Sequence, residues 1–382
     1  MKPGLPFIFI FLSLIGLFSC SKSKSIDGAT LSFYTWNNVF SLDSSQYSFL
    51  TEHKINHLHV KVMEIGYIEG YPDKPEVKNH ITIGYNNQAG QYFTDNKLTP
   101  VIFLENDMFY KLGKDKIPQL ASLVKRALQI HTLDLIIEKE DIFPSRWDKL
   151  FFSLNTKQDH NDSLQKVYDR FLENIVSYEF DCDWTEKTRD NYFYFLQNIK
   201  DSLQAPIEST LRLHQYKFRE KMGIPPVDRV NLMCYNMDAV KKMDTQNSIF
   251  EKEILFQYLK GQKAYPVKLN VAFPLFNWMV VFRNGTFLRL VPGEDLKDKQ
   301  DQLEGTGSNQ YRVKNSIYLN WSESLQEGDI IRLETVKVSD LKETYSEILE
   351  NTEEKPEEII FFDLQSAVTK ESIHELEEII PR

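Results

Sequence analysis

Short apolar runs alternate with longer amphipathic stretches along most of the chain. The runs are rich in β-branched and aromatic residues, and they lie at 31–36, 55–63, 99–105, 178–184, 209–216, 229–236, 267–274 and 358–363. Apolar residues at helical spacing fill 117–130, 186–203 and 249–259 between them. Strand-like runs that alternate with helical segments are typical of a parallel sheet.

Eight such runs predict an α/β fold, namely a single (β/α)₈ barrel of the TIM type over residues 30–382. Extra chain at about 278–345 separates the last two runs. It contains Asn284-Gly285 between two apolar segments, the preferred chemistry of a two-residue hairpin turn. We therefore expect a small β insertion between strands seven and eight. A polar loop at 297–309, an acidic linker at 349–358 and a closing helix at 370–380 complete the prediction.

The amino terminus has its own pattern. Residues 5–18 are almost entirely apolar, a run too short to cross a bilayer comfortably but suited to the core of a signal peptide. The segment Leu17-Phe18-Ser19-Cys20 resembles the bacterial lipobox, although Phe18 is bulkier than the usual residue there. We expect residues 1–19 to be a lipoprotein signal, Cys20 to carry lipid, and residues 20–29 to form a polar tether. An ordinary secretory peptide with an incidental Cys20 and an uncleaved anchor are the alternatives.

Charge and cysteine content then narrow the function. Without Lys2, the mature chain has 44 Lys and Arg against 55 Asp and Glu, a formal charge of −11. That acidity argues against a nucleic-acid partner. Only Cys182 and Cys234 remain after Cys20, too few for a disulfide scaffold. Export predicts a place in a bacterial cell envelope, with the membrane as a partner through Cys20. The sequence predicts no oligomeric state.

The most informative segment for chemistry lies at the end of the fourth run. Asp181 and Asp183 are two residues apart, so they share one face of a strand, and carboxyl ends of barrel strands line active sites. Two close carboxylates raise the pKa of one of them, which is one way for a site to acquire a proton donor.

These motifs resemble those of glycoside hydrolase family 18, which includes chitinases and endo-β-N-acetylglucosaminidases. The similar stretches are Asp181-Cys182-Asp183-Trp184-Thr185, Met233-Cys234-Tyr235-Asn236 and the run that ends at Pro274. The resemblance implies that Asp183 orients the acetamido group of the substrate and that Tyr235 steadies it. It also implies that Thr185 replaces the catalytic Glu of the family, and that Asn236 replaces an Asp.

Three hypotheses follow for this site. Glu186 supplies the acid if the backbone turns, although strand alternation places it opposite Asp183 and acids favour a helix start, for which Thr185 is a suitable N-cap. Alternatively Asp183 is itself the acid, with Glu179 and Asp181 on the same face. In the third hypothesis the barrel has lost hydrolysis and binds glycans or a protein partner.

Further candidate residues follow from position alone. Residues near predicted strand ends are candidates for ligand binding: Tyr34, Trp36, Arg212, His214, Met233, Asn236 and Trp278. Arg212 and His214 alternate along the fifth run and face the mouth if the strand continues through them. His57 and His59 resemble a metal pair, but no acid at suitable spacing completes them, so we expect no metal. Without nucleotide-binding or Gly-x-Ser-x-Gly motifs, we expect no cofactor.

Together these patterns predict a membrane-anchored envelope lipoprotein that binds glycans without hydrolysing them. Two alternatives stay open. One is an active glycosidase on N-acetylglucosamine-containing glycans that uses Asp183 or Glu186, with Asp181 and Tyr235 beside them. The other is a non-catalytic scaffold that binds a partner and holds no ligand in the barrel.

Overall fold

The structure is a computed structural model. It describes residues 25–26, 29–84, 88–135, 169, 171–292, 299, 301–319, 324–351 and 355–367. The expected signal segment, the lipidation residue Cys20, most of the tether and the closing helix at 370–380 lie outside these residues.

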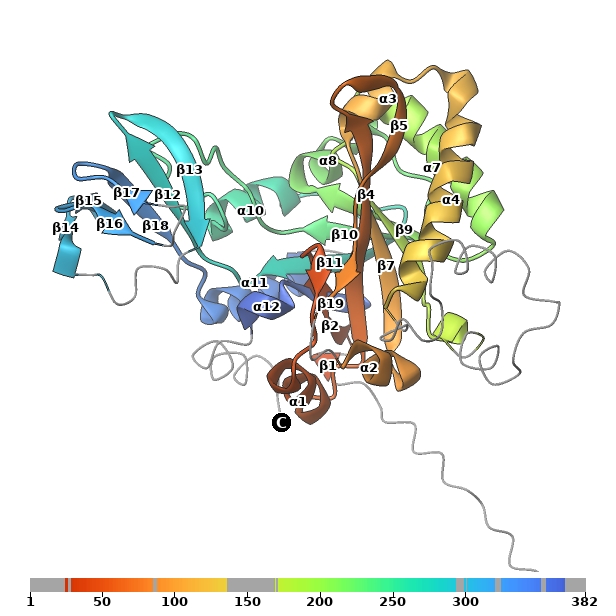
Figure 1. Cartoon of the computed structure of the whole chain (residues 1–382), viewed down its shortest axis with the longest axis horizontal. Coiled ribbons are helices and arrows are strands. Elements are labelled where there is room, and N and C mark those ends of the chain that lie inside the picture. The colour runs from red at the N-terminus through yellow and green to blue at the C-terminus, as the bar shows by residue number, and fades with distance from the viewer. Residues whose placement is uncertain are drawn as a thin grey trace, which may run out of the picture.

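Eight parallel strands close into a barrel, which confirms the predicted fold class (Figure 1). In spatial order β19, β11, β10, β9, β8, β7, β4 and β2 pair with one another, and β2 pairs back to β19. The strands are β2 (Ala29–Thr35), β4 (His57–Ile68), β7 (Lys97–Leu104), β8 (Tyr178–Asp181), β9 (Ile207–Arg212), β10 (Arg229–Met233), β11 (Lys268–Pro274) and β19 (Glu358–Phe362). Each overlaps one of the eight predicted runs.

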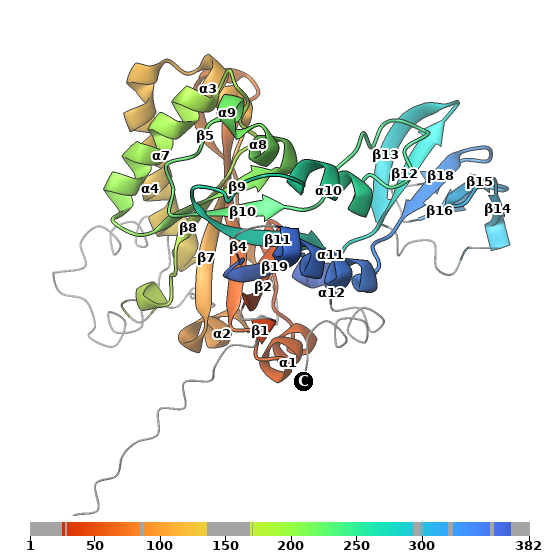
Figure 2. The same cartoon turned by 180° about the vertical axis from the view of Figure 1, so that it is seen from behind.

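Helices surround the barrel (Figure 2), and the longest ones, such as α4 and α7, bury an apolar stripe against it. The stripe of α4 buries Leu120, Val124 and Leu128, as the sequence pattern predicts. The helices are α1 (Ser44–Glu52), α2 (Ala89–Asp95), α3 (Asn106–Lys111), the 3₁₀ turn Lys114–Lys116, α4 (Ile117–Leu133), α7 (Arg189–Leu203), α8 (Leu213–Lys217), α9 (Arg219–Met222), α10 (Lys252–Leu259), α11 (Val338–Asn351) and α12 (Leu364–Ala367). Within the described ranges, none of these helices combines the length and apolarity needed to cross a membrane.

Further strands lie outside the eight that close the barrel. β5 (Tyr71–His80) runs antiparallel to the long strand β4 and makes a projecting hairpin with it. β1 (Ser25–Ile26) pairs with β2, and β3 (Val39–Phe40) pairs with β6 (Thr82–Ile83).

The predicted β insertion is present and lies beside the barrel (Figures 1 and 2). Its antiparallel strands are β12 (Trp278–Arg283), β13 (Thr286–Pro292), β14 (Leu303–Gly305), β15 (Gln310–Val313), β16 (Ile317–Tyr318), β17 (Ser324–Leu325) and β18 (Ile330–Glu334). Asn284 and Gly285 have φ of 52° and 74°, as the predicted two-residue hairpin turn requires. The insertion has its own apolar core, which includes Met279, Val281 and Ile331.

Several predicted boundaries are wrong, and the predicted polar loop at 297–309 contains the strand β14. The fifth run is a strand only as far as Arg212, because the Gln215 side chain accepts a hydrogen bond from the Arg212 backbone N–H and begins α8 there. The fourth strand ends at Asp181, and α7 begins at Arg189 with Thr188, rather than Thr185, at its N-cap position. The acidic segment at 349–358 is only partly a linker, since α11 extends into it and Glu358 is buried in β19.

Candidate ligand-binding site at the barrel mouth

The carboxyl ends of the barrel strands form a mouth that combines charged and aromatic side chains. Lys61 lies within β4, Asp181 and Arg212 are the last residues of β8 and β9, and Tyr235 follows β10. Tyr235 is almost fully buried, whereas Lys61 and Arg212 are half-buried. This is the end of a (β/α)₈ barrel that carries active sites.

Asp183 is held by Arg212. The guanidinium Nε donates to Oδ1 of Asp183, and Nη2 donates to Oδ2 over 2.6 Å. Burial opposes the charge on Arg212, but the Asp183 carboxylate raises the pKa of the guanidinium above its usual value. An acid catalyst would use one of the two carboxylate oxygens of Asp183. Both oxygens are engaged in a bidentate ion pair with Arg212.

Asp181 lies deeper and has a different environment. It is buried and accepts a 2.6 Å hydrogen bond from the Thr210 hydroxyl. Burial raises the pKa of its carboxyl to about 7, the Thr210 hydrogen bond opposes that shift, and the negative charge of Asp183 adds to it. Asp181 thus titrates near neutral pH below the mouth.

Thr185 and Glu186 lie on the exposed turn that leads into α7. The Thr185 hydroxyl is 3.2 Å from the hydroxyl of Thr188, which donates in turn to Asn106. Glu186 interacts with Arg189 at the start of that helix. The structure does not bring Glu186 together with the two aspartates.

Aromatic rings make a continuous cluster around the mouth. Ring centroids are 5.5 Å apart for Trp36 and Phe362, 5.5 Å for Phe362 and Tyr235, and 5.2 Å for Phe276 and Trp278. Phe276 contacts both Tyr235 and Phe362, which joins the two halves of the cluster. All except Tyr235 are half-buried, so ring surface remains open to solvent.

Sequence reasoning missed part of this cluster. Trp36, Tyr235 and Trp278 were candidates, but Phe276, Phe362 and Phe103, which contacts Trp36 at 6.4 Å, were not. A signal existed, since each of the three phenylalanines lies at or just beyond the end of a predicted strand. Lys61, whose ammonium lies 5.3 Å from the Trp36 ring centroid, belongs to the same surface.

Two aromatic candidates, Tyr34 and Trp278, donate hydrogen bonds to buried glutamates. Tyr34 is 1% exposed, and its hydroxyl donates to Glu179 over 2.6 Å, so it supports the mouth from inside the barrel. The Trp278 indole N–H donates to Glu334 over 2.7 Å. Glu334 also accepts from Ser248 and Arg332, which fixes the indole against the insertion.

A pocket beside Arg212 brings five of the predicted residues together. It encloses about 320 Å³, its open mouth included, and is lined by Arg212, Leu213, His214, Met233, Tyr235, Asn236, Met237 and Tyr258. His214 reaches it from α8, where it is exposed, and not from the strand that the sequence suggested. Burial and the Arg212 charge lower the pKa of His214.

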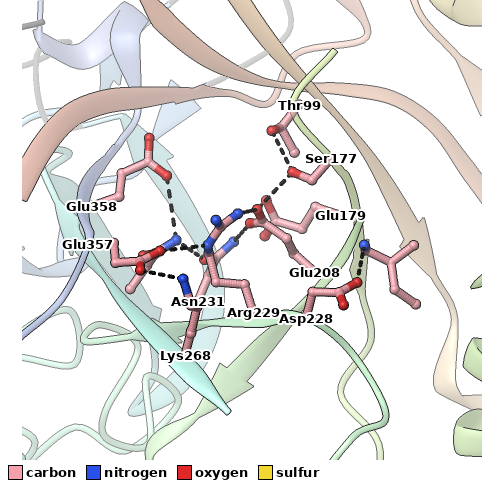
Figure 3. Close-up of polar contacts among 12 residues, drawn as sticks. Thr99, Ser177, Glu179, Glu208, Asp228, Arg229, Asn231, Lys268, Glu357 and Glu358 are labelled. Atoms are coloured by element: carbon pink, nitrogen blue, oxygen red, sulfur yellow. Dashed lines mark hydrogen bonds and ion pairs between the residues drawn. The ribbon is translucent and has the colours of Figure 1, made fainter. Parts of the chain in front are cut away.

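Below the mouth, the barrel interior is polar. Figure 3 shows Glu208 accepting hydrogen bonds from Ser177, Arg229 and Asn231, over 2.7, 2.9 and 3.0 Å. The Ser177 hydroxyl also lies 3.0 Å from that of Thr99 (Figure 3). These residues make a hydrogen-bonded layer at the amino-terminal ends of the strands.

His57 and His59 belong to this interior, and acids reach them from other strands although none stands at suitable spacing in the sequence. Nδ1 of His57 lies 2.6 Å from Oε1 of Glu358, and Nδ1 of His59 lies 2.8 Å from Oε2 of Glu179. Burial lowers the pKa of His59, but Glu358 and Glu179 outweigh it and raise that pKa to about 10. The acid comes from the last barrel strand, which no local spacing could reveal.

No family model and no curated protein matches the sequence. Solved structures are distantly similar in fold. A chitinase from Chromobacterium violaceum ATCC 12472 is 10% identical, with 93% of this chain and 99% of that chain covered and a TM-score of 0.46. The spore cortex-lytic enzyme SleL of Bacillus cereus is 13% identical, with 91% and 73% covered and a TM-score of 0.45. Concanavalin B is 11% identical, with 93% and 100% covered and a TM-score of 0.41.

Proposed function

We propose that this protein binds glycans at the barrel mouth and does not hydrolyse them. A binding site for an amphipathic ligand needs apolar ring surface with a few polar groups at fixed positions. The mouth offers half-buried Trp36, Phe362 and Trp278 beside the Arg212–Asp183 pair. Sugars, with apolar ring faces and hydroxyl rims, match that combination.

The observation that carries the proposal is the bidentate pair between Arg212 and Asp183. An acid that protonates a leaving oxygen must be free to approach it. Asp183 is engaged by Arg212, Glu186 lies on the exposed turn before α7, and Thr185 has no carboxyl group. These contacts support neither hypothesis that supplies an acid, which favours the third, binding without hydrolysis.

A direct test is calorimetric titration of the full-length protein with N-acetylglucosamine oligomers and other envelope glycans. We expect binding to the native chain and at least tenfold weaker binding to Trp36→Ala. Tyr318→Ala is the matched control, because this tyrosine is 77% exposed in β16 of the insertion and is not part of the aromatic cluster described above. Equal affinities for all three proteins would contradict the proposal, and absence of binding to every glycan would favour the scaffold alternative.

One observation favours a glycosidase as the second candidate. The Asp181 carboxyl, with its pKa raised by burial to about 7, retains a proton at neutral pH as a general acid must. Its burial below the mouth opposes contact with a leaving oxygen. Hydrolysis that disappears in Asp181→Asn and persists in Asp183→Asn would establish this candidate.

We also propose that lipid on Cys20 holds the protein on a bacterial envelope membrane. The support is the signal-like segment followed by the lipobox-like motif. A single acyl chain binds a membrane only weakly, so stable attachment requires more than one acyl chain on Cys20. Expression with radiolabelled palmitate should label the native chain and leave Cys20→Ala unlabelled and released from membranes. An unlabelled native chain would contradict this assignment.

A further inference from the structure

We propose that His57, His59 and Glu358 form a binding site for a divalent transition metal, zinc above all, in the amino-terminal layer of the barrel. The site is separate from the mouth and does not depend on glycan binding. His57 and His59 project inward from β4, and Glu358 projects inward from the first position of β19. One ligand atom from each lies within 4.8 Å of the others.

The hydrogen bonds of the two histidines leave the correct nitrogens for a metal. Nε2 of His57 lies 3.0 Å from the Thr99 hydroxyl, and Nδ1 of His59 lies 2.8 Å from the Glu179 carboxylate. The remaining nitrogens, Nδ1 of His57 and Nε2 of His59, both face Glu358. Metal-binding histidines usually have this arrangement, in which an outer oxygen orients each ring from the opposite side.

His59 Nε2 is the atom that most directly indicates a missing ligand. It is fully buried and has no hydrogen-bond partner, and the closest Glu358 oxygen is 3.4 Å away. Asn270 Oδ1 and Ser32 Oγ are also buried without hydrogen-bond partners in neighbouring strands. Buried polar atoms are rarely left unpaired, and Nδ2 of the same Asn270 side chain lies 3.5 Å from Glu358 Oε2, so the unpaired atoms indicate a missing occupant beside this carboxylate.

The charges in this layer also favour a cation. Glu208 pairs with Arg229, but Glu179 and Glu358 have only the two histidines as charged neighbours among the ion pairs of the described chain. A dication bound by neutral imidazoles carries two positive charges, which balance the carboxylates of Glu179 and Glu358. Any second ring proton leaves to solvent when the metal binds. Two imidazole nitrogens and a carboxylate oxygen are ligands that suit zinc.

The position assigns a structural role to this ion. His57 and Glu358 side chains are 8% and 9% exposed, which gives a narrow route from the amino-terminal end of the barrel. That end contributes to stability in these barrels, whereas chemistry occurs at the other. A bound ion joins β4 to β19 and thereby the first half of the barrel to its last strand.

A second histidine group in the described residues fits a metal less well. His80, His131 and Asp134 also lie close together, but the two rings are stacked with planes 13° apart and centroids 4.4 Å apart. An ion cannot lie in both ring planes without a large rotation. The His57 and His59 ring planes are inclined by 39°, so these two rings are not stacked in parallel.

The test begins with full-length protein stripped by a chelator and titrated with zinc against a colorimetric competitor. We expect one zinc per chain, a rise in the melting temperature with zinc, and at least tenfold weaker binding in His59→Gln and in Glu358→Gln. Glu208→Gln is the matched control, because it removes a buried carboxylate of the same layer that is not in the proposed set, and it should bind like the native chain.

X-ray absorption of the zinc-loaded native chain gives a measurement that needs no variant. We expect two imidazoles and oxygen around the ion and no sulfur, since neither Cys182 nor Cys234 belongs to the group. No zinc retained by the native chain would overturn the proposal and leave His57 and His59 as structural partners of Glu358 and Glu179. Binding lost in Glu208→Gln but kept in Glu358→Gln would also overturn it, in favour of the group His59, Glu179 and Glu208.

Discussion

The Arg212 guanidinium donates to both carboxylate oxygens of Asp183 across the ends of β9 and β8. This pair occupies the place where the sequence suggested a catalytic aspartate. It is also partly exposed, with 33% of the Arg212 side chain and 46% of the Asp183 side chain open to solvent. The pair therefore lies at the surface of the mouth rather than in the core.

Arg212→Ala should change ligand binding much more than folding. A half-exposed ion pair contributes at most about 1 kcal/mol to stability, because water screens it. Glycan affinity should fall at least fivefold, since the variant loses a fixed donor at the pocket. Urea unfolding and calorimetric titration of the same samples measure both effects. Loss of stability by several kcal/mol with unchanged affinity would make the pair purely structural.

The effect of Asp181→Asn on stability should depend on pH. The folded-state pKa of Asp181 is raised from 3.8 to about 7, so the folded chain holds this proton more tightly than the unfolded chain. Stability therefore falls as pH rises from about 4 to 7. Each pKa unit is worth about 1.4 kcal/mol, so the effect amounts to a few kcal/mol at most.

The asparagine of the Asp181→Asn variant does not ionise, so the variant does not lose stability in this way as pH rises. We expect the variant to unfold at higher urea than the native chain at pH 8 and to lose that advantage at pH 4.5. Equal differences in unfolding free energy at the two pH values would contradict the assignment of this pKa to Asp181.

Glu334 should position Trp278. Its carboxylate accepts from the indole N–H, from Ser248 and from Arg332, whose side chain is fully buried. Removing one partner of a buried pair costs about 3–5 kcal/mol because the other charge is left unpaired. Glu334→Ala should therefore destabilise the insertion and make the Trp278 environment more heterogeneous.

Asp329→Asn provides the comparison for Glu334. It breaks another ion pair of the insertion, with Arg283, and Asp329 makes no hydrogen bond to Trp278 or Ser248. We expect it to leave tryptophan fluorescence and glycan affinity unchanged, while Glu334→Ala alters both. Identical fluorescence spectra for the two variants would mean that Glu334 does not hold the indole.

The sequence was sufficient to predict the fold because each barrel strand has a pattern that is visible in its own local sequence. Alternation within β4 or β11, and helical spacing in α4, depend only on neighbouring residues. Boundaries failed where one side chain decides them, as when Gln215 caps α8 and ends β9 at Arg212. That contact depends on the backbone conformation, which periodicity does not reveal.

The candidate site was only partly predictable for a related reason. Arg212 and Asp183 were both identified, but their pairing joins residues 29 positions apart. Glu358 reaches His57 across 301 positions, so the acid that completes the histidine pair was invisible to local spacing. Phe276 and Phe362 resemble core residues in sequence, and only their place at the mouth distinguishes them.

The central claim is that the mouth binds glycans without cleaving them. The most direct measurement incubates the full-length protein with the glycans that it binds and follows products by mass spectrometry, with Asp183→Asn as the control. The account predicts intact glycans with native protein and with the variant over many hours. New products with native protein that vanish in Asp183→Asn would contradict it and establish a glycosidase.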